Sequence, residues 1–473
     1  MKKAFVGVRL KRLREERRLT QQGLADSLGI SLSYLNQIEN NQRPITVPIL
    51  LRLNAAFGVD VQLFSDEDEA RLVGGLREAF ASLHGGEAVS LAEMREIAAN
   101  MPAVARAVHA LHRQGSRAVE QVEALSTVLG DDRKPPAAGL PTMPYEEVRD
   151  YFSARANHIP ELDEIAERLA GDLNMPLGRF DAPLENRLRQ KHGVAVEIGR
   201  DQPGAAAQRR FDPATKTLSL SSRLSEGQRA FQLATQLCFL EQEGLLDRLA
   251  GPGQFGNGET RALARIGLAN YFAGALIMPY GAFLQAAEAL RYDIELLEQK
   301  FNVGYETVCH RLSTLQRPQA RGVPFFFVRV DRAGNISKRQ SATNFHFSRV
   351  GGTCPLWNVY EAFATPGHIC TQLAEMPDGR AYLWIARTVS HRGGGFGAPA
   401  KAYSIGLGCD LENAGRLVYS KGLALGDPGA RTPIGAGCKL CERADCSQRA
   451  FPALARRLVV DERVASFAPY SVS

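Results

Sequence analysis

The sequence lacks any long apolar run: its hydrophobic stretches stay far below the roughly 20 residues that a membrane-spanning helix needs. No apolar core follows the positive charges at the N-terminus, so a secretory signal is not expected either. Low-complexity tracts and heptad repeats are also missing, and the composition is that of an ordinary globular protein. A cytoplasmic protein is therefore expected, and its length of 473 residues favours roughly three domains over one core.

Cysteine is scarce over most of the chain and concentrated at its end. Of the eight cysteines, six fall in the last 120 residues, namely Cys354, Cys370, Cys409, Cys438, Cys441 and Cys446. A long cytosolic chain is not expected to carry a disulfide framework. The clustering therefore indicates a separate chemical role.

Positive charge is concentrated at the N-terminus. Residues 1–18 contain eight Lys or Arg and two Glu, so they account for the whole net charge of +6. A basic end on a neutral body indicates a polyanion as partner there. A merely solvated basic helix would give the same charge pattern.

The first sixty residues predict four or five short helices. Leu10 and Leu13 share one face of the first helix. Thr20 is a suitable N-cap for the second, and Gly29 permits the tight turn after it. A third helix follows the turn, and a fourth spans residues 47–57. This order of helix, glycine turn and helix is typical of a helix-turn-helix.

The outward side of the third helix carries short hydroxyl, phenol and amide side chains, which suit base edges and phosphates in a major groove. Gln21 lies in the first turn of the second helix, where a phosphate contact is expected. The predicted DNA-binding residues are Arg14, Gln21, Gln22, Ser31, Ser33, Tyr34, Gln37 and Asn40. A four-helix module that contacts another protein is the alternative.

The segments LTQQGLADSLGIS and YLNQIENNQRPI closely resemble the phage-repressor-like helix-turn-helix family. One departure is Asn41, where that family usually has glycine; asparagine tolerates the same left-handed conformation. The resemblance implies double-stranded DNA as a partner. It also implies a homodimer, because this family generally binds DNA as a dimer.

The middle of the chain predicts a helical connector followed by an α+β domain. Helical patterns fill residues 65–135, and these helices are expected to carry dimer contacts. The segment GDDRKPPAAGLPTMP predicts a linker. From residue 145 helices alternate with a strand in GVAVEIG and a hairpin in RRFDPATKTLSLS. Continuous helices are expected over residues 226–250 and 259–290.

The middle domain resembles the HExxH zinc metallopeptidase-like domain that is often joined to such repressors, through FQLATQLCFLE, LANYFAGALIMP and FNVGYETVCHRLSTLQ. Zinc peptidase chemistry needs two histidines one helical turn apart, a glutamate base and a third ligand downstream. The motif positions hold Thr235, Gln236 and Phe239, and RIGLANYF contains no acidic residue. These side chains cannot bind zinc or accept a proton from water. We therefore expect no enzymatic activity and a scaffold kept as a ligand-sensing pocket.

A pocket lined by apolar helix faces suits an acyl chain, and arginines at its mouth suit phosphates. The candidate ligand-binding residues are Arg187, Arg189, Arg209 and Arg210. Each of them is also compatible with an ordinary exposed arginine.

The C-terminal part of the chain predicts strands. They are expected in a hairpin that turns at Ala333–Gly334–Asn335 and in AYLWIARTVSH, AYSIGLGCD and GRLVYSK, with a helix-like segment in RAFPALARRLV. The segment HRGGGFG favours a flexible hairpin over a phosphate cradle. The expected fold is mainly α with an α+β sensor region. Its parts are a helix-turn-helix bundle at 1–64, a helical connector at 65–135, a peptidase-like α+β domain at 145–318 and a cysteine-rich α+β domain at 322–473.

Cys438, Cys441 and Cys446 have a spacing at which a turn can point their sulfurs toward one metal group. The flanking basic residues, which would offset the negative charge of a thiolate–metal unit, are Lys439, Arg443 and Arg449. For the fourth ligand, the glycine flanks favour Cys409, with Cys354 as competitor and Cys370 third.

Three clustered cysteines with a remote fourth favour a [4Fe–4S] cluster. Zinc is the alternative metal, although it usually prefers two paired cysteine knuckles and only one pair is present. Unligated thiols, including a disulfide-based switch, are the remaining alternative.

The motifs GGTCPLWNVYEAF, IGLGCD and GAGCKLCERADCSQRAFP resemble the short-chain fatty acyl regulator family of bacterial transcription factors. With the two preceding domains, the resemblance covers nearly all 473 residues. Relatives in that family govern propionate, methylcitrate-cycle and glyoxylate-type metabolism. The resemblance implies DNA binding tuned by an acyl-CoA ligand and an iron–sulfur cluster. Two alternatives are a redox or iron sensor whose cluster is the signal, and a metallopeptidase acting on a repressor, which the missing zinc ligands disfavour.

Overall fold

The computed structural model describes residues 7–40, 42–57, 66–81, 89–129, 144–199, 207–255, 257–342, 354–391, 397 and 400–435, and near the C-terminus 437–438, 441, 443, 446–452, 458–460, 463–464 and 471–472. The chain divides into two compact units. The first comprises Met1–Pro141, Asn344–Thr353 and Ala436–Ser473, and the second comprises Thr142–Thr343 and Cys354–Gly435.

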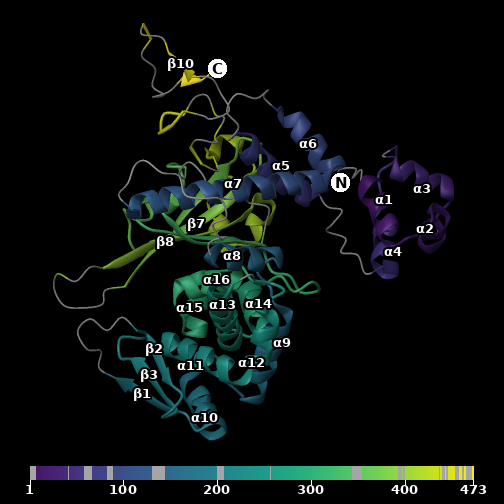
Figure 1. Cartoon of the computed structure of the whole chain (residues 1–473). Helices are drawn as coiled ribbons and strands as arrows, with labels where there is room; N and C mark the ends of the chain where they lie inside the picture. The colour runs from purple at the N-terminus through teal and green to yellow at the C-terminus, as the bar shows by residue number, and fades with distance from the viewer. Residues whose placement is uncertain are drawn as a thin grey trace. The chain divides into compact units, whose positions relative to one another are not determined.

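The N-terminal helices of the first unit match the prediction (Figure 1). They are α1 (Gly7–Glu16), α2 (Gln21–Leu28), α3 (Leu32–Glu39) and α4 (Val47–Phe57). Thr20 caps α2 and Ser31 caps α3, because each hydroxyl accepts a hydrogen bond from the amide three residues later. Gly29 ends α2 at a φ of 61°, a conformation that glycine adopts without strain. Arg52 of α4 then donates to the carbonyls of Leu28 and Gly29.

The predicted helical connector is also confirmed within the described residues. It consists of α5 (Asp66–Ala81), α6 (Leu91–Asn100) and α7 (Pro102–Leu129). A capping box joins Ser90 and Glu93 at the start of α6. Leu72, Leu76, Met94, Ala98 and Ala105 form the small core that holds the three helices together. Dimer contacts by these helices stay a prediction. The predicted linker covers residues 130–144, and of these 130–143 lie outside the described residues.

The second unit begins with helices around a small sheet. The helices are α8 (Pro144–Ala154), α9 (Pro160–Asp172), α10 (Asp181–His192), α11 (Glu226–Glu241), α12 (Glu243–Leu249), α13 (Gly258–Ile277), α14 (Tyr280–Ala289), α15 (Ile294–Phe301) and α16 (Tyr305–Leu312). The sheet has three strands in the order β1 (Ala195–Gly199), β3 (Thr217–Ser221) and β2 (Arg209–Asp212). The strand in GVAVEIG and the β2–β3 hairpin confirm the prediction, and β1 runs parallel to β3.

Two helices that were expected to be continuous are broken. The helix over 226–250 breaks at Gln242, two residues before Gly244, a weak helix former. The helix over 259–290 bends by 62° between α13 and α14. Pro279 lies at that bend. Its ring clashes with the preceding helical turn and it has no amide hydrogen to donate, so the helix cannot continue straight. Among the described residues no single helix is long and apolar enough to cross a membrane, and only the bent pair α13–α14 passes that test of length and composition.

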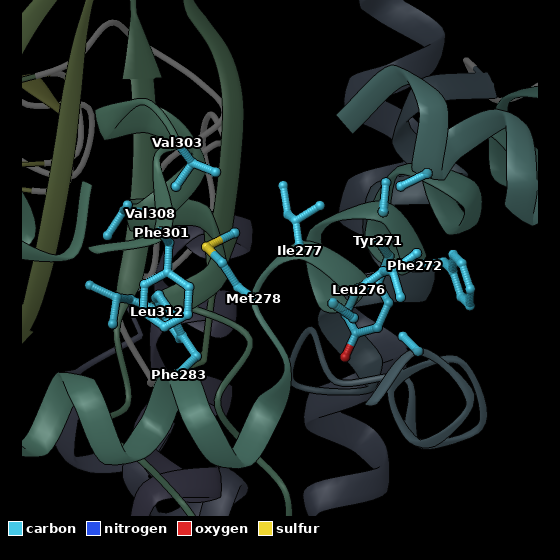
Figure 2. Close-up of a cluster of buried hydrophobic side chains, with 14 of the residues drawn as sticks. Tyr271, Phe272, Leu276, Ile277, Met278, Phe283, Phe301, Val303, Val308 and Leu312 are labelled. Atoms are coloured by element: carbon cyan, nitrogen blue, oxygen red, sulfur yellow. The ribbon is translucent and has the colours of Figure 1, made fainter. Parts of the chain in front are cut away.

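Helix α13 is the centre of the second unit's core. It packs against α8, α9, α11, α12 and α16 (Figure 1). Its side chains Tyr271, Phe272, Leu276 and Ile277 are buried on several sides of the helix. Figure 2 shows these residues with Phe283, Phe301, Val308 and Leu312, which come from α14, α15 and α16. Burial at about 25 cal/mol per Å² of apolar surface makes this cluster a main source of the unit's stability.

A second sheet has six strands in the order β5-β4-β8-β7-β6-β9. They are β4 (Phe326–Val330), β5 (Ile336–Ser341), β6 (Cys370–Glu375), β7 (Ala381–His391), β8 (Lys401–Asp410) and β9 (Thr432–Pro433). All neighbours are antiparallel except β6 and β9. Leu383, Ile385 and Leu407 of this sheet share one hydrophobic cluster with the helices around α13. The predicted fold class, mainly α with α+β regions, is confirmed, whereas the four domain boundaries stay a prediction.

One predicted strand of the C-terminal region is wrong, and the described ends of a predicted helix there are not helical. GRLVYSK lies in short 3₁₀ turns, η2 (Leu411–Arg416) and η3 (Val418–Ser420), because its backbone bonds to Arg291 rather than to a strand. The carbonyls of Gly415 and Leu417 accept hydrogen bonds from the Arg291 guanidinium. The Val418 amide donates to the Arg291 carbonyl. The helix-like segment over 449–459 ends instead in a strand, β10 (Leu458–Val459), which pairs with β11 (Ser471–Val472). Residues 453–457 lie outside the described part.

A buried ion pair joins distant helices of the second unit. Arg311 of α16 donates to Asp163 of α9 at 2.7 Å and to the carbonyl of Met278, the residue that caps α13, at 3.0 Å. His158 lies 3.2 Å from the other Asp163 oxygen. Burial alone would raise the pKa of Asp163, but the charges of Arg311 and His158 outweigh it and hold that pKa below its usual value.

Replacing Arg311 with Met leaves the Asp163 carboxylate buried without its cation. We expect the free energy of unfolding at neutral pH to fall by about 3–5 kcal/mol, the cost of breaking a buried ion pair. Urea denaturation measures this difference, which should shrink at acid pH because protonation of Asp163 removes the unpaired charge in the variant. Equal stability of the variant and the wild type at neutral pH would contradict the role of this pair.

Candidate DNA interface, vestigial metal site and cysteine loop

The solvent-facing side of α3 brings together the side chains that were predicted to read DNA. Ser33, Gln37 and Asn40 recur at helical spacing on that side, with Ser33 and Asn40 exposed and Gln37 half-buried. Leu35 and Ile38 are buried on the opposite side. No side-chain hydrogen bond ties Ser33 or Gln37 to another residue of the described structure, so both remain available to a partner.

The other predicted DNA-binding residues make local contacts. Ser31 is occupied as the cap of α3, while Tyr34 lies 5.6 Å below the Arg43 guanidinium. Gln22 donates to Asp26 within α2, and Asn40 donates to Asn36 within α3. Each side chain still has exposed surface, and its role on DNA stays a prediction.

A buried carboxylate that the sequence reading missed lies behind this surface. The Glu39 side chain is only 2% exposed and accepts from the Arg14 guanidinium at 2.7 and 3.3 Å. It also accepts from the Gln21 amide at 2.7 Å. The hydrogen bonds that Arg14 donates to Glu39 raise the pKa of Arg14 above its ordinary value. Arg14 and Gln21 thus tie α1 and α2 to α3, and any phosphate contact by either side chain stays a prediction.

The degenerate metal motif lies on α11 and faces the protein interior. Thr235 is 2% exposed and its hydroxyl donates back to the carbonyl of Phe231 at 2.7 Å. Gln236 is 4% exposed, and within the described structure its amide makes no hydrogen bond. Phe239 has the Arg209 guanidinium 5.3 Å from its ring centre. An arginine–aromatic contact thus occupies the side of α11 where a peptidase would hold zinc.

Arg209 differs from the other three predicted ligand-binding arginines in its burial and its hydrogen bonding. Arg187 makes two 2.8 Å hydrogen bonds to Glu241, and Arg189 pairs with Glu185 one turn away. Arg210 is exposed. Arg209 comes from β2, an outer strand of the small sheet, and its Nη1 atom is inaccessible to solvent without a hydrogen-bond partner in the described residues. Burial lowers the pKa of Arg209.

The Glu241 carboxylate lies two residues after Phe239 and pairs with three basic side chains. Although burial raises its pKa, hydrogen bonds from Arg187, His192 and Lys191 lower it to about 2. Arg187 is therefore fixed by a permanent negative charge. The pairing leaves Arg209 as the candidate arginine best able to accept an anionic ligand.

A separate surface cavity of about 280 Å³ lies where the first turns of α10 and α11 meet Asn302. None of the four predicted arginines lines it. Its charged lining residues are Arg179, Asp181 and Glu226.

The cysteine loop of the first unit has two buried thiols. Cys438 and Cys441 are 7% and 9% exposed, and Cys446 is half-buried. The amide of Ala450 donates to the Cys438 sulfur at 3.2 Å, and the amide of Cys441 donates to the Cys438 carbonyl at 3.4 Å. This last bond brings the backbones of Cys438 and Cys441 together, while their role as metal ligands stays a prediction.

The predicted ligand set is not assembled in the described residues. No three His, Cys, Asp or Glu side chains among them are gathered so that they could hold a metal ion. Cys354 and Cys409 belong to the second unit, so the choice between them stays a prediction. Burial raises the pKa of Cys409, which lies in the hydrophobic cluster of the second unit, and this environment disfavours a thiolate. Cys370 is half-buried on β6 and lies 3.5 Å from the Thr365 hydroxyl.

Three family models match the chain in succession. A helix-turn-helix model matches residues 10–64, an IrrE N-terminal-like domain matches 189–313, and the C-terminal domain of short-chain fatty acyl coenzyme A regulators matches 314–470.

Whole-length relatives carry regulatory names. The chain is 51% identical over 470 residues to the HTH-type transcriptional regulator PrpR of Mycobacterium tuberculosis, covering 99% of this chain and 96% of the relative. It is 51% identical to RamB, an HTH-type transcriptional regulator of the same species, covering 100% and 99%. It is 44% identical to a propionyl-CoA carboxylase regulator of Cereibacter sphaeroides, covering 99% of both. A solved structure of a Mycobacterium tuberculosis transcriptional regulator, 54% identical, covers 70% of this chain and 99% of its own with a TM-score of 0.67.

Proposed function

This chain belongs to the short-chain fatty acyl coenzyme A regulator family, and from that membership we propose that it is a DNA-binding transcriptional regulator of short-chain acyl-CoA metabolism. The observation that carries the proposal is the 51% identity over essentially the whole chain to an HTH-type transcriptional regulator. The solvent-facing side chains of α3 support it. Loss of the zinc motif at Thr235, Gln236 and Phe239 supports a regulator rather than a peptidase.

The proposed DNA reader divides its contacts between phosphates and bases. Basic residues of the N-terminal segment attract the phosphate backbone, which gives affinity without sequence preference. Ser33 and Gln37 lie on the side of α3 that faces outward, where hydroxyl and amide groups suit base edges. Two copies of the chain would place two such helices on successive half-sites, and we propose a cytoplasmic homodimer as the DNA-binding form.

We expect Gln37→Ala to reduce sequence preference without unfolding the domain. The variant should lose about 1–3 kcal/mol of discrimination between an operator selected from a random library and an unrelated duplex, because a base contact is removed. Fluorescence anisotropy at two salt concentrations measures both affinities. The salt dependence should stay unchanged, since Gln37 carries no charge.

Arg14→Met is the matched contrast for that experiment. It leaves Glu39 buried without its cation, so it should lower the thermal midpoint of the domain and weaken binding to every duplex. Gln37→Ala should keep the wild-type midpoint. An unchanged operator preference in Gln37→Ala would remove this residue from the proposed interface.

A short-chain acyl-CoA is the proposed effector, and we place it at the vestigial metal site. Arg209 offers a partly buried guanidinium whose Nη1 has no hydrogen-bond partner in the described residues. Gln236, which is 4% exposed, offers an amide that makes no hydrogen bond there. The thioester and the phosphates of such a ligand are hydrogen-bond acceptors, which both groups can satisfy. An effector changes DNA binding only when it binds one arrangement of the protein more tightly than another.

We expect Arg209→Met to weaken binding of propionyl-CoA by about tenfold or more, because a hydrogen bond to a charged group contributes about 1.5–3 kcal/mol. Isothermal titration calorimetry measures the affinity. Arg210→Met is the control, since it removes the same charge from the next residue of β2, which is exposed. An equal loss in both variants, or none in Arg209→Met, would contradict this location.

The third proposed element is a [4Fe–4S] cluster on Cys438, Cys441, Cys446 and a fourth cysteine, with zinc as the alternative metal. Thiol ligands, a backbone N–H directed at the Cys438 sulfur and a buried Arg449 nearby fit a negatively charged thiolate–metal group. Such a group supplies redox chemistry to the loop when it is bound. A regulator whose cluster is itself the signal is the second candidate function, which the clustering of cysteines at the end of the chain favours.

A further inference from the structure

Arg449 is enclosed by the backbone of the cysteine loop. The residue is only 2% exposed. Nη2 donates to the carbonyl of Cys441 at 3.1 Å and to that of Arg443, while Nη1 donates to the carbonyls of Cys438 at 3.5 Å and Phe451 at 3.3 Å. One guanidinium thus connects four backbone carbonyls on both sides of the loop.

The same arginine also joins the loop through its own backbone. The Arg449 amide donates to the carbonyl of Cys446 at 3.1 Å. The next amide, that of Ala450, donates to the Cys438 sulfur. Residues 449–450 therefore donate hydrogen bonds to all three cysteines of the motif. The acceptors are the carbonyls of Cys438, Cys441 and Cys446 and the sulfur of Cys438.

Among the described residues, no acidic side chain balances the charge of Arg449. No carboxylate of the described structure pairs with its guanidinium, and its buried Nε has no hydrogen-bond partner there. A buried cation is costly unless it is paired and hydrogen-bonded. Carbonyl dipoles offset part of that cost, and a negative group beside the loop would offset the rest. Ligated thiolates of Cys438 and Cys441 are such a group.

We propose that Arg449 is the positioning residue of the cysteine site. It holds the backbone turn that carries Cys438 and Cys441, and its buried charge favours the negatively charged metal–thiolate group. This inference rests on the proposed metal-binding function of the loop. Lysine does not replace it, because a single ammonium lacks the planar set of donors that reaches carbonyls on two sides.

The experiment compares full-length wild type with Arg449→Met, Arg449→Lys and Arg443→Met, each purified without oxygen. Arg443→Met removes a neighbouring positive charge and keeps the backbone carbonyl that Arg449 uses. Iron and sulfide content are measured on the purified proteins, and Co²⁺ affinity is measured on metal-free protein through thiolate-to-cobalt absorption. Hydrogen exchange of residues 437–451 in the metal-free proteins reports the loop backbone itself. DNA affinity serves as the control for folding of the N-terminal domain.

Both Arg449 variants should lose iron and sulfide, bind Co²⁺ about 10- to 100-fold more weakly and exchange these amides faster, as expected when a residue that supports metal ligands is removed. Arg443→Met should resemble the wild type. Wild-type exchange and metal content in Arg449→Lys, or an equal loss in Arg443→Met, would overturn the proposal. A wild type that binds neither iron nor Co²⁺ would refute the proposed metal site, while the exchange rates would still decide whether Arg449 holds the loop.

Discussion

The buried pair of Arg311 and Asp163 is the constraint on which the second unit depends. It joins α16 to α9, and the bond to the Met278 carbonyl connects both to the end of α13. Helix α13 carries the apolar side chains around which α8, α9 and α11 pack. A peptidase-like scaffold can therefore keep its shape after its zinc ligands are lost. This core and this ion pair hold its helices together.

Replacement of the zinc-binding motif changes which side chains the interior of that scaffold offers. A peptidase would place two imidazoles and a glutamate where this chain has Thr235, Gln236 and Phe239. Thr235 satisfies its hydroxyl within its own helix. Among the described residues, the buried Nη1 of Arg209 has no hydrogen-bond partner, and the Gln236 amide makes no hydrogen bond. Such atoms are uncommon in protein interiors and indicate a ligand or another functional reason. The proposed effector gives both groups a partner.

Local features of the sequence were sufficient to predict the N-terminal helices. The cap Thr20 and the left-handed Gly29 act through neighbours in sequence, so their roles can be read without a structure. Glu39 and Arg449 could not be assigned in the same way. Their partners are set by the tertiary fold or by carbonyls, which look alike at every position of a sequence. Arg291 illustrates the same limit, since its bonds to residues 415–418 turn a strand-like segment into 3₁₀ turns.

The central claim is that an acyl-CoA changes DNA binding by this protein. The most direct measurement is the operator affinity of the intact, anaerobically purified protein, by fluorescence anisotropy, with propionyl-CoA, with free coenzyme A and with neither. The account predicts that propionyl-CoA changes the affinity by about 5- to 150-fold, the range of ordinary allosteric coupling, and that free coenzyme A changes it less. Identical operator affinity under all three conditions would contradict it.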